Sequence, residues 1–326
     1  DNAIHSVTLP STLKSIGANA FTNNKITTLS LPASVTAIGS SAFSGNALTA
    51  AHLSSDIEYG TSVFAQNAIT DVTFDDSIKA IPAGMFDGNE LTSVKLPSTL
   101  THIEPFAFSN NALQNIELPR AIAEIGEGAF QHNNISDLVL SANNEIYGKN
   151  VFLHNPLTSV RFAEGTTHIK DFLFDGAKLT NVTIPEGVTH IGKAAFRENA
   201  LTSITIPNSV TTIGDMAFGD NQLTTVALPA ELTTLGKEAF RNNALTQITI
   251  PTSVTSIGSY AFAHNKLKKL HVPASIANVE TSTFAYNELE DVTIEKASII
   301  SGGAFMGNRI HTLSLKKKKK TIGPEA

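Results

Sequence analysis

The sequence contains no cysteine, no tryptophan and only four tyrosines among its 326 residues. The absence of cysteine excludes disulfide frameworks, thiolate metal sites and cysteine nucleophiles. No apolar run approaches the roughly 18 residues that a membrane-spanning helix needs, and the enzyme signatures HExxH and GxSxG do not occur. The formal net charge is −6, which gives no reason to expect nucleic acid or an anionic membrane. We therefore expect no nucleic-acid partner and no insertion into a membrane.

Phenylalanine sets a period along the whole chain. The interval between successive members of the series is 22 residues, except for 21 residues before Phe64 and before Phe305. The series comprises Phe21, Phe43, Phe64, Phe86, Phe108, Phe130, Phe152, Phe174, Phe196, Phe218, Phe240, Phe262, Phe284 and Phe305.

Other residues keep fixed distances from this phenylalanine. Leu or Ile follows five residues after it, two more apolar residues follow after eight and ten, and then comes a frequent proline; an Ile-Gly pair and an Ala-Phe pair close the unit. Residues 195–218 read AFRENALTSITIPNSVTTIGDMAF. A period of 20 to 29 residues with such an apolar skeleton is typical of a leucine-rich repeat. We predict a solenoid of 22-residue coils with a parallel β-sheet on one face and short turns, 3-10 or β segments on the other.

The expected strand of each coil can be placed within this unit. Residues 201–206 alternate apolar and polar side chains, and Pro207 ends the segment because proline cannot donate to a ladder. Stacking the coils would pair these strands in parallel about 4.8 Å apart, with Ile204 and Ile206 inward. Glycine follows the later isoleucine in 9 of 14 units, which indicates either a positive φ or a close approach of two backbones.

Asparagine stands three residues after the phenylalanine in 13 of 14 units, with Ala177 as the exception. A polar residue repeated between core positions is best explained as a structural ladder, because buried amides must satisfy hydrogen bonds. At Ala177 we expect a local weak point or a bound water. The predicted ladder comprises Asn24, Asn46, Asn67, Asn89, Asn111, Asn133, Asn155, Asn199, Asn221, Asn243, Asn265, Asn287 and Asn308.

The repeated IGxxAF followed by LTxIxIPxSVTxIG resembles the BspA-like, or Treponema pallidum type, leucine-rich repeats, whose pattern is LxxIxIPxxVxxIGxxAFxxC. The resemblance covers essentially the whole chain. This sequence departs from the family in having asparagine where the family usually has cysteine, and in a period one residue shorter. The resemblance implies a secreted or surface-anchored bacterial protein that attaches to host or matrix molecules. The family shares no ligand motif, so no binding residue can be carried over.

We expect residues 1–326 to form a single leucine-rich-repeat domain of about 14 to 15 coils, truncated in mid-repeat at both ends. A second period of 88 residues relates Tyr59 to Tyr147, and the units after them carry Phe74 and Phe162 at the second strand position. Duplication of a four-repeat block, roughly 43–130 and 131–218, explains this period. Alternatively, the irregular units change the curvature or present a loop.

The outward-facing strand positions are the expected binding surface of a solenoid. From these we select Lys95, Glu117, Asp137 and Arg161 as candidate ligand-binding residues. The structural alternative is that residues at one phase only pair across coils, which contributes roughly 0–1 kcal/mol for exposed ions. The predicted pairs are Lys95 with Glu117, Lys268 with Glu290, and Lys269 with Asp291.

Two further groups of polar residues are better explained as ordinary solvent-exposed surface than as a metal site or a polymer-binding site. His132 and His154 share one phase and His168 and His190 another, but two histidines are too few for zinc, so no metal site is expected. The lysine run at 316–320 could touch an anionic wall polymer, although a solvated face explains it better.

We predict a monomeric, extracellular or surface-bound binding and adhesion module with no enzymatic activity and no cofactor. Its partner would be a host or matrix protein or a glycan. The rivals are a passive stalk or spacer of a larger surface protein, and the non-catalytic part of a larger extracellular enzyme. Binding predicts unpaired, solvent-facing groups around Glu117 and Arg161, whereas a stalk predicts uniform pairing.

Overall fold

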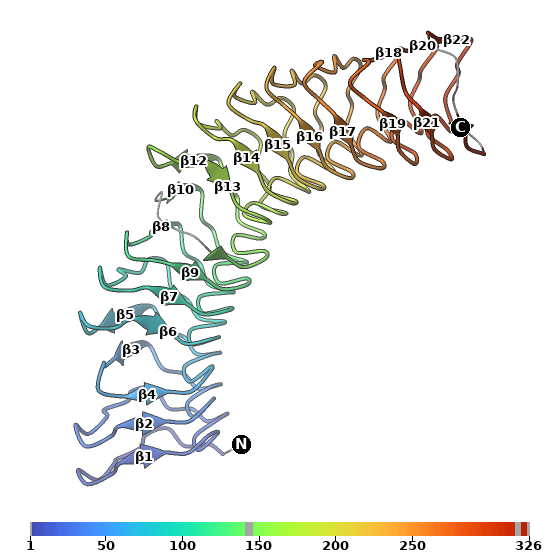
Figure 1. Cartoon of the computed structure of the whole chain (residues 1–326). Coiled ribbons are helices and arrows are strands. Elements are labelled where there is room, and N and C mark those ends of the chain that lie inside the picture. Colours follow the sequence, from blue (N-terminus) through green and yellow to red (C-terminus); the bar gives the residue numbers. More distant parts are fainter. Residues whose placement is uncertain (1, 141–145, 317–320, 325–326) are drawn as a thin grey trace. The chain divides into compact units, whose positions relative to one another are not determined.

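The computed structural model describes residues 2–140, 146–316 and 321–324. The chain forms two compact units, Asp1–Arg161 and Phe162–Ala326, and in each the backbone winds through stacked coils of 21 or 22 residues (Figure 1). The described residues form strands and turns without any helix, so none of their segments is a helix that could cross a membrane. The predicted solenoid of parallel strands is therefore confirmed, whereas a single domain over the whole chain stays a prediction.

One strand row consists of two-residue strands, called here the short strands, which end five residues before each phenylalanine. All pair in parallel with the same position one coil away, as Ser15 does with Ala37. In the first unit they are β1 (Ser15–Ile16), β2 (Ala37–Ile38), β4 (Glu58–Tyr59), β6 (Ala80–Ile81), β7 (His102–Ile103), β9 (Glu124–Ile125) and β11 (Ile146–Tyr147). In the second they are β13 (His168–Ile169), β14 (His190–Ile191), β15 (Thr212–Ile213), β16 (Thr234–Leu235), β17 (Ser256–Ile257), β19 (Asn278–Val279), β21 (Ile299–Ile300) and β23 (Thr321–Ile322).

A second row, called here the long strands, lies at the phase where the sequence predicts the main sheet. Its members form the sheets β3-β5, β12-β10-β8 and β18-β20-β22. They are β3 (Ala50–Leu53), β5 (Asp71–Phe74), β8 (Asn115–Glu117), β10 (Asp137–Leu140), β12 (Ser159–Phe162), β18 (Lys269–Val272), β20 (Asp291–Ile294) and β22 (Thr312–Leu315).

The prediction that residues 201–206 form a strand is wrong, although their side chains alternate between buried and exposed as expected. Ile204 and Ile206 are buried and Ser203 is exposed, but the segment is not part of a strand. The reason is the proline that follows. Asp75, Glu295 and Lys316 stand at this position in other coils, and their N–H groups extend the ladder, as Asp75 N does to Leu53 O at 3.0 Å. Proline has no N–H to donate, so most proline-containing coils run past each other without this pairing.

The repeat glycine is required for close approach, not for a positive φ. The glycines with positive φ lie at other phases. A Cβ on Gly236 would lie 2.4 Å from Asp215 N, and one on Gly258 would lie 2.4 Å from Lys237 N. In these coils a side chain at this position would therefore collide with the preceding coil, whereas other coils carry residues such as Pro82 and Lys170 there.

Phenylalanine rings form the core of both units. The rings stack with centroids 5.3 Å apart for the half-buried Phe21 and the buried Phe43, and 5.2 Å apart for the buried Phe218 and Phe240. The residues two before and two after each phenylalanine have positive φ, even where they are large, as at Phe106 and Tyr286. Two such residues in one coil make the tight turn by which the backbone leaves the short strand and leads to the phase of the long strand.

The asparagine that follows each ring is bonded to two coils at once. Asn133 Oδ1 accepts from Leu113 N at 3.0 Å, and Asn133 Nδ2 donates to Phe108 O at 2.9 Å and to Phe130 O at 3.0 Å. The other twelve asparagines of the series make the same kind of contact, with their Oδ1 accepting a backbone N–H. Ala177 is buried and offers no amide; the weak point or water expected there stays a prediction.

Candidate ligand-binding face

The four residues selected from the sequence lie on or beside the long strands of the first unit. Glu117 belongs to β8, Asp137 to β10 and Arg161 to β12, while Lys95 lies at the same phase one coil before Glu117. All four side chains are exposed. The register pairs Asn115 with Asp137 and Glu117 with Val139.

Four residues at the same phase of successive coils form a row of cationic, anionic and apolar side chains, called here the charged row. It consists of Lys95, Glu117, Val139 and Arg161. Val139 is 47% exposed, which is high for a valine within a strand. Asp137 lies beside the row and accepts a hydrogen bond from its neighbour Ser136 Oγ at 3.3 Å. An apolar side chain between opposite charges offers a partner both contact area and polar anchors.

Ion pairing divides the long strands into two groups. Among the described residues no ion pair joins Lys95 to Glu117, and Arg161 has none either, so the pairing predicted there is wrong. Lys268 and Glu290 do not pair in the described part of the chain, whereas Lys269 Nζ lies 3.4 Å from Asp291 Oδ2 as predicted. The sheet β18-β20-β22 also holds contacts from His271 and Lys316 to Glu295, each at 3.4 Å.

A recess of about 540 Å³ lies between two coils of the charged row. Lys95, Glu117 and Arg120 are among its lining residues. Leu96 and Leu118 add buried apolar surface to the lining. The structure thus brings two of the four selected residues to one hollow, while Asp137 and Arg161 lie on the strands that follow it.

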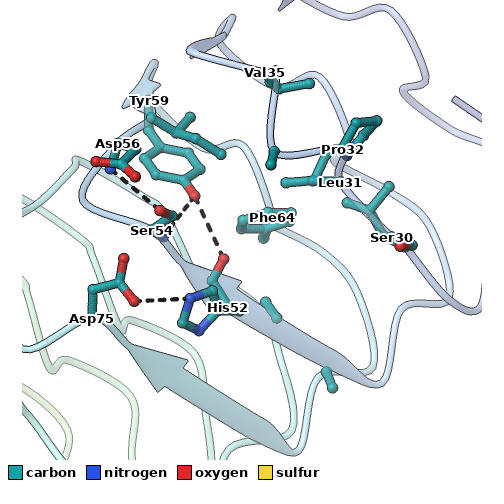
Figure 2. Close-up of a pocket in the computed structure, with 15 residues that line it drawn as sticks. Ser30, Leu31, Pro32, Val35, His52, Ser54, Asp56, Tyr59, Phe64 and Asp75 are labelled. Carbon is teal, nitrogen blue, oxygen red and sulfur yellow. Dashed lines mark hydrogen bonds and ion pairs between the residues drawn. The ribbon is translucent and has the colours of Figure 1, made fainter. Parts of the chain in front are cut away.

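A second hollow, which the sequence did not reveal, lies beside β3 and is called here the β3 pocket. Its volume is about 460 Å³. Figure 2 shows Tyr59, His52 and Asp75 along one side, Leu31, Pro32 and Val35 along the other, and Phe64 between them. All lining residues belong to the first unit.

The β3 pocket exists because Ala51 is too small to fill its position. Eight residues after the phenylalanine, the other 13 coils carry Leu, Val or Ile, and only this coil carries alanine. Leu29 and Leu31 of the preceding coil line the pocket and are half-buried. Aligning the coils at this one position is the signal that could have found the pocket.

Polar groups hold the edge of the β3 pocket in place. Tyr59 occupies the core isoleucine position of its coil, and its hydroxyl oxygen accepts from Ser54 N at 3.1 Å. Burial raises the pKa of Tyr59. His52 Nε2 lies 3.2 Å from Asp75 Oδ1, and His52 Nδ1 lies 2.9 Å from Thr73 Oγ1. The hydrogen bond from Ser55 N, at 2.9 Å, is the main cause that lowers the pKa of Asp75.

The histidine pairs are real neighbours. The rings of His132 and His154 have centroids 4.6 Å apart, and so have those of His168 and His190. Burial, followed by the charge of His190, lowers the pKa of His168. Among the residues that the structure describes, no three His, Asp or Glu side chains are grouped as metal ligands. Of the lysine run, Lys316 is described, and Lys317 to Lys320 lie outside the described residues.

Comparison with known proteins identifies the repeat. The model of the BspA type leucine rich repeat region matches in six copies, over residues 1–91, 58–178, 167–290 and 212–326. A search of curated protein sequences gave no significant match. Three bacterial structures are similar.

A leucine-rich repeat protein from Bacteroides ovatus superposes with a TM-score of 0.60 at 23% identity, over 82% of this chain and 72% of that one. A leucine-rich cell surface protein from Faecalibacterium prausnitzii gives a TM-score of 0.47 at 18% identity, over 97% and 89% of the two chains. The pneumococcal vaccine antigen PcpA gives 0.47 at 17% identity, over 94% and 78%. At these identities the similarity concerns the fold alone.

Proposed function

Because this chain belongs to the BspA-type leucine-rich-repeat family, we propose that it is a non-catalytic binding and adhesion module at a bacterial surface or outside the cell. Its partner is a host or matrix protein or a glycan, bound through the charged row of the first unit. Surface attachment is what the family resemblance implies. The location of the site on this chain rests on the geometry of the row.

The observation that carries this proposal is the exposed and unpaired state of the charged row. Lys95, Glu117 and Arg161 have no ion-pair partner among the described residues, and Val139 is 47% exposed beside them. A structural face would be expected to pair its charges across coils, as Lys269 and Asp291 do at 3.4 Å. Unpaired charges around an apolar residue resemble the polar rim and apolar centre of a protein interface.

The paired sheet β18-β20-β22 supports a second role, that of a stalk, for the second unit. Two of its lysines lie near carboxylates of the neighbouring coil, Lys269 Nζ at 3.4 Å from Asp291 Oδ2 and Lys316 Nζ at 3.4 Å from Glu295 Oε1. Such a face offers fewer free groups to a partner. One chain can therefore combine a binding unit with a spacer unit.

The test is a screen of the protein on arrays of glycans and extracellular-matrix proteins. The wild type and the variant Lys95→Ala/Glu117→Ala/Arg161→Ala are compared. A signal that the triple variant loses supports binding through the charged row. A signal that the variant keeps would mean that the binding site lies elsewhere on the solenoid. No signal above background at micromolar concentration leaves the stalk as the better account of the whole chain.

A further inference from the structure

We propose that the β3 pocket is a second binding site, which takes a primary ammonium group carried on an apolar stem, as in a lysine side chain of a partner polypeptide. The pocket lies on different coils from the charged row and shares none of its residues. The proposal therefore goes beyond the surface-binding function and does not depend on the charged row being correct.

The first argument is the unfilled apolar wall. Leu29 and Leu31 line the pocket and are half-buried, and Ala51 leaves space at a position where Leu138 of another coil provides a larger, buried side chain. Pro32 and Ile57 add to the same wall. Covering such surface gains roughly 25 cal/mol per Å² of apolar area removed from water. A ligand with an apolar stem would make the contacts that a leucine makes in a regular coil.

The second argument is the charge of the rim. Asp56 and Asp75 line the pocket, together with the hydroxyl groups of Ser30 and Ser54, and no lysine or arginine lines it. The carboxylate of Asp56 makes no hydrogen bond or ion pair within the described residues. An anionic ligand would meet two like charges, whereas a cation would meet the unengaged carboxylate of Asp56. Charge complementarity therefore selects an ammonium group.

The third argument is that one side chain, lysine, combines the apolar stem that fits the wall with the positive charge that fits the rim. Lysine carries a four-carbon stem that packs on apolar surface while its ammonium group stays at the polar edge. The pocket volume of about 460 Å³ leaves room for the stem and for parts of the neighbouring residues. In Figure 2 Asp75 and Asp56 lie beside Tyr59 at one edge, opposite Leu31 and Pro32.

The hydrogen bonds of His52 hold one edge of the pocket. Both ring nitrogens of His52 are engaged, Nδ1 with Thr73 Oγ1 at 2.9 Å and Nε2 with Asp75 Oδ1 at 3.2 Å. Ser54 Oγ accepts a hydrogen bond from Asp56 N at 3.2 Å and lies outside that pair. Neither ring nitrogen of His52 is therefore bonded to Ser54, whose side chain lines the pocket.

The test is a titration of the full chain with short probes, followed by NMR. The probes are the peptide acetyl-Leu-Lys-Leu-amide, the same peptide with acetylated lysine, and free n-pentylamine. We expect saturable shifts of the amides of Ala51, Tyr59 and Asp75 with the lysine peptide, and at least tenfold weaker binding of the acetylated peptide. Tighter binding of the peptide than of pentylamine identifies a polypeptide source, whereas equal binding identifies a free amine.

Three variants locate the site. Ala51→Leu fills the pocket with the side chain that Leu138 and Leu270 provide at the same phase, so it should fold and should bind at least tenfold more weakly. Asp56→Asn should weaken binding three- to tenfold, and the matched control Asp71→Asn, at an exposed carboxylate that does not line the pocket, should leave it unchanged. The proposal is overturned if Ala51→Leu binds as well as the wild type, if acetylation has no effect, or if no probe saturates at 10 mM. None of these results bears on the charged row.

Discussion

The side-chain oxygen of Asn133 accepts a hydrogen bond from the backbone N–H of Leu113 at 3.0 Å, twenty residues earlier in the preceding coil. The side-chain nitrogen of Asn133 donates to Phe108 O at 2.9 Å and to Phe130 O at 3.0 Å. One buried side-chain amide thereby forms hydrogen bonds with backbone groups of two coils. These groups lie outside the short strands. The repetition of this contact along both units makes it a main source of their cohesion.

The first prediction concerns this contact. Asn133→Ala should lower the free energy of unfolding by about 3 kcal/mol, because it leaves buried backbone groups without partners. Hydrogen exchange should show faster exchange at the Leu113 amide. The Leu91 amide, which donates to Asn111 Oδ1 at 3.1 Å, is the internal control and should change less. Unchanged protection at Leu113 would mean that the ladder is dispensable.

The second prediction concerns the repeat glycine. Gly236→Ala would place a Cβ 2.4 Å from Asp215 N and 2.4 Å from Gly214 C, and these are backbone atoms that cannot move aside alone. We expect a loss of about 2 kcal/mol in the free energy of unfolding, the usual cost of overpacking. Urea denaturation followed by circular dichroism measures it.

Gly17→Ala is the matched control for this substitution. A Cβ on Gly17 has no heavy atom within 4 Å, so the change should stay within about 0.5 kcal/mol. Equal effects of the two substitutions would show that glycine is kept for backbone flexibility and not for close approach.

The third prediction concerns pH. Arg197 donates to both carboxylate oxygens of Asp175, at 2.9 Å and 3.0 Å. Burial raises the pKa of Asp175, and the bonds from Arg197 oppose that rise. Arg197→Ala leaves a largely buried carboxylate unpaired and should cost about 2 kcal/mol at pH 7, the lower end for such pairs because the arginine is partly exposed.

The loss in the Arg197→Ala variant should depend on pH with a definite sign. The folded carboxyl then binds its proton more tightly than the unfolded one, so the loss is present above the folded pKa and disappears below the unfolded pKa of about 3.9. Urea midpoints of the variant and the wild type should approach each other between pH 7 and pH 4. A gap that stays constant over that range would contradict this account of Asp175.

The sequence was sufficient to predict the solenoid, its period and the phase of its core, because each feature recurs 14 times and chance agreement is excluded. It did not predict which segment forms the ladder. That depends on a single N–H, since Pro207 cannot make the bond that Asp75 makes to Leu53 O at 3.0 Å. A pattern of apolar residues does not show which backbone N–H groups can donate. It therefore predicts a strand in the regular coils at a segment that forms none.

The candidate site could be predicted only in part. Exposure of Lys95 and Arg161 follows from alternation along a strand, but the absence of a Lys95–Glu117 pair depends on side-chain geometry that the phase does not fix. The β3 pocket was missed because it results from a side chain that is too small. Ala51 is as apolar as the residues it replaces, and a pattern of apolar positions does not record volume.

The central claim is that a partner binds through the charged row, and its most direct test is an affinity measurement on the ligand that the array identifies. The dissociation constant is compared between the wild type, Lys95→Ala/Glu117→Ala/Arg161→Ala, and a control with the same residue types, Lys14→Ala/Glu231→Ala/Arg309→Ala, whose three side chains are also exposed. We predict at least tenfold weaker binding for the charged-row variant and less than twofold change for the control. Equal affinities of the two variants would contradict the claim.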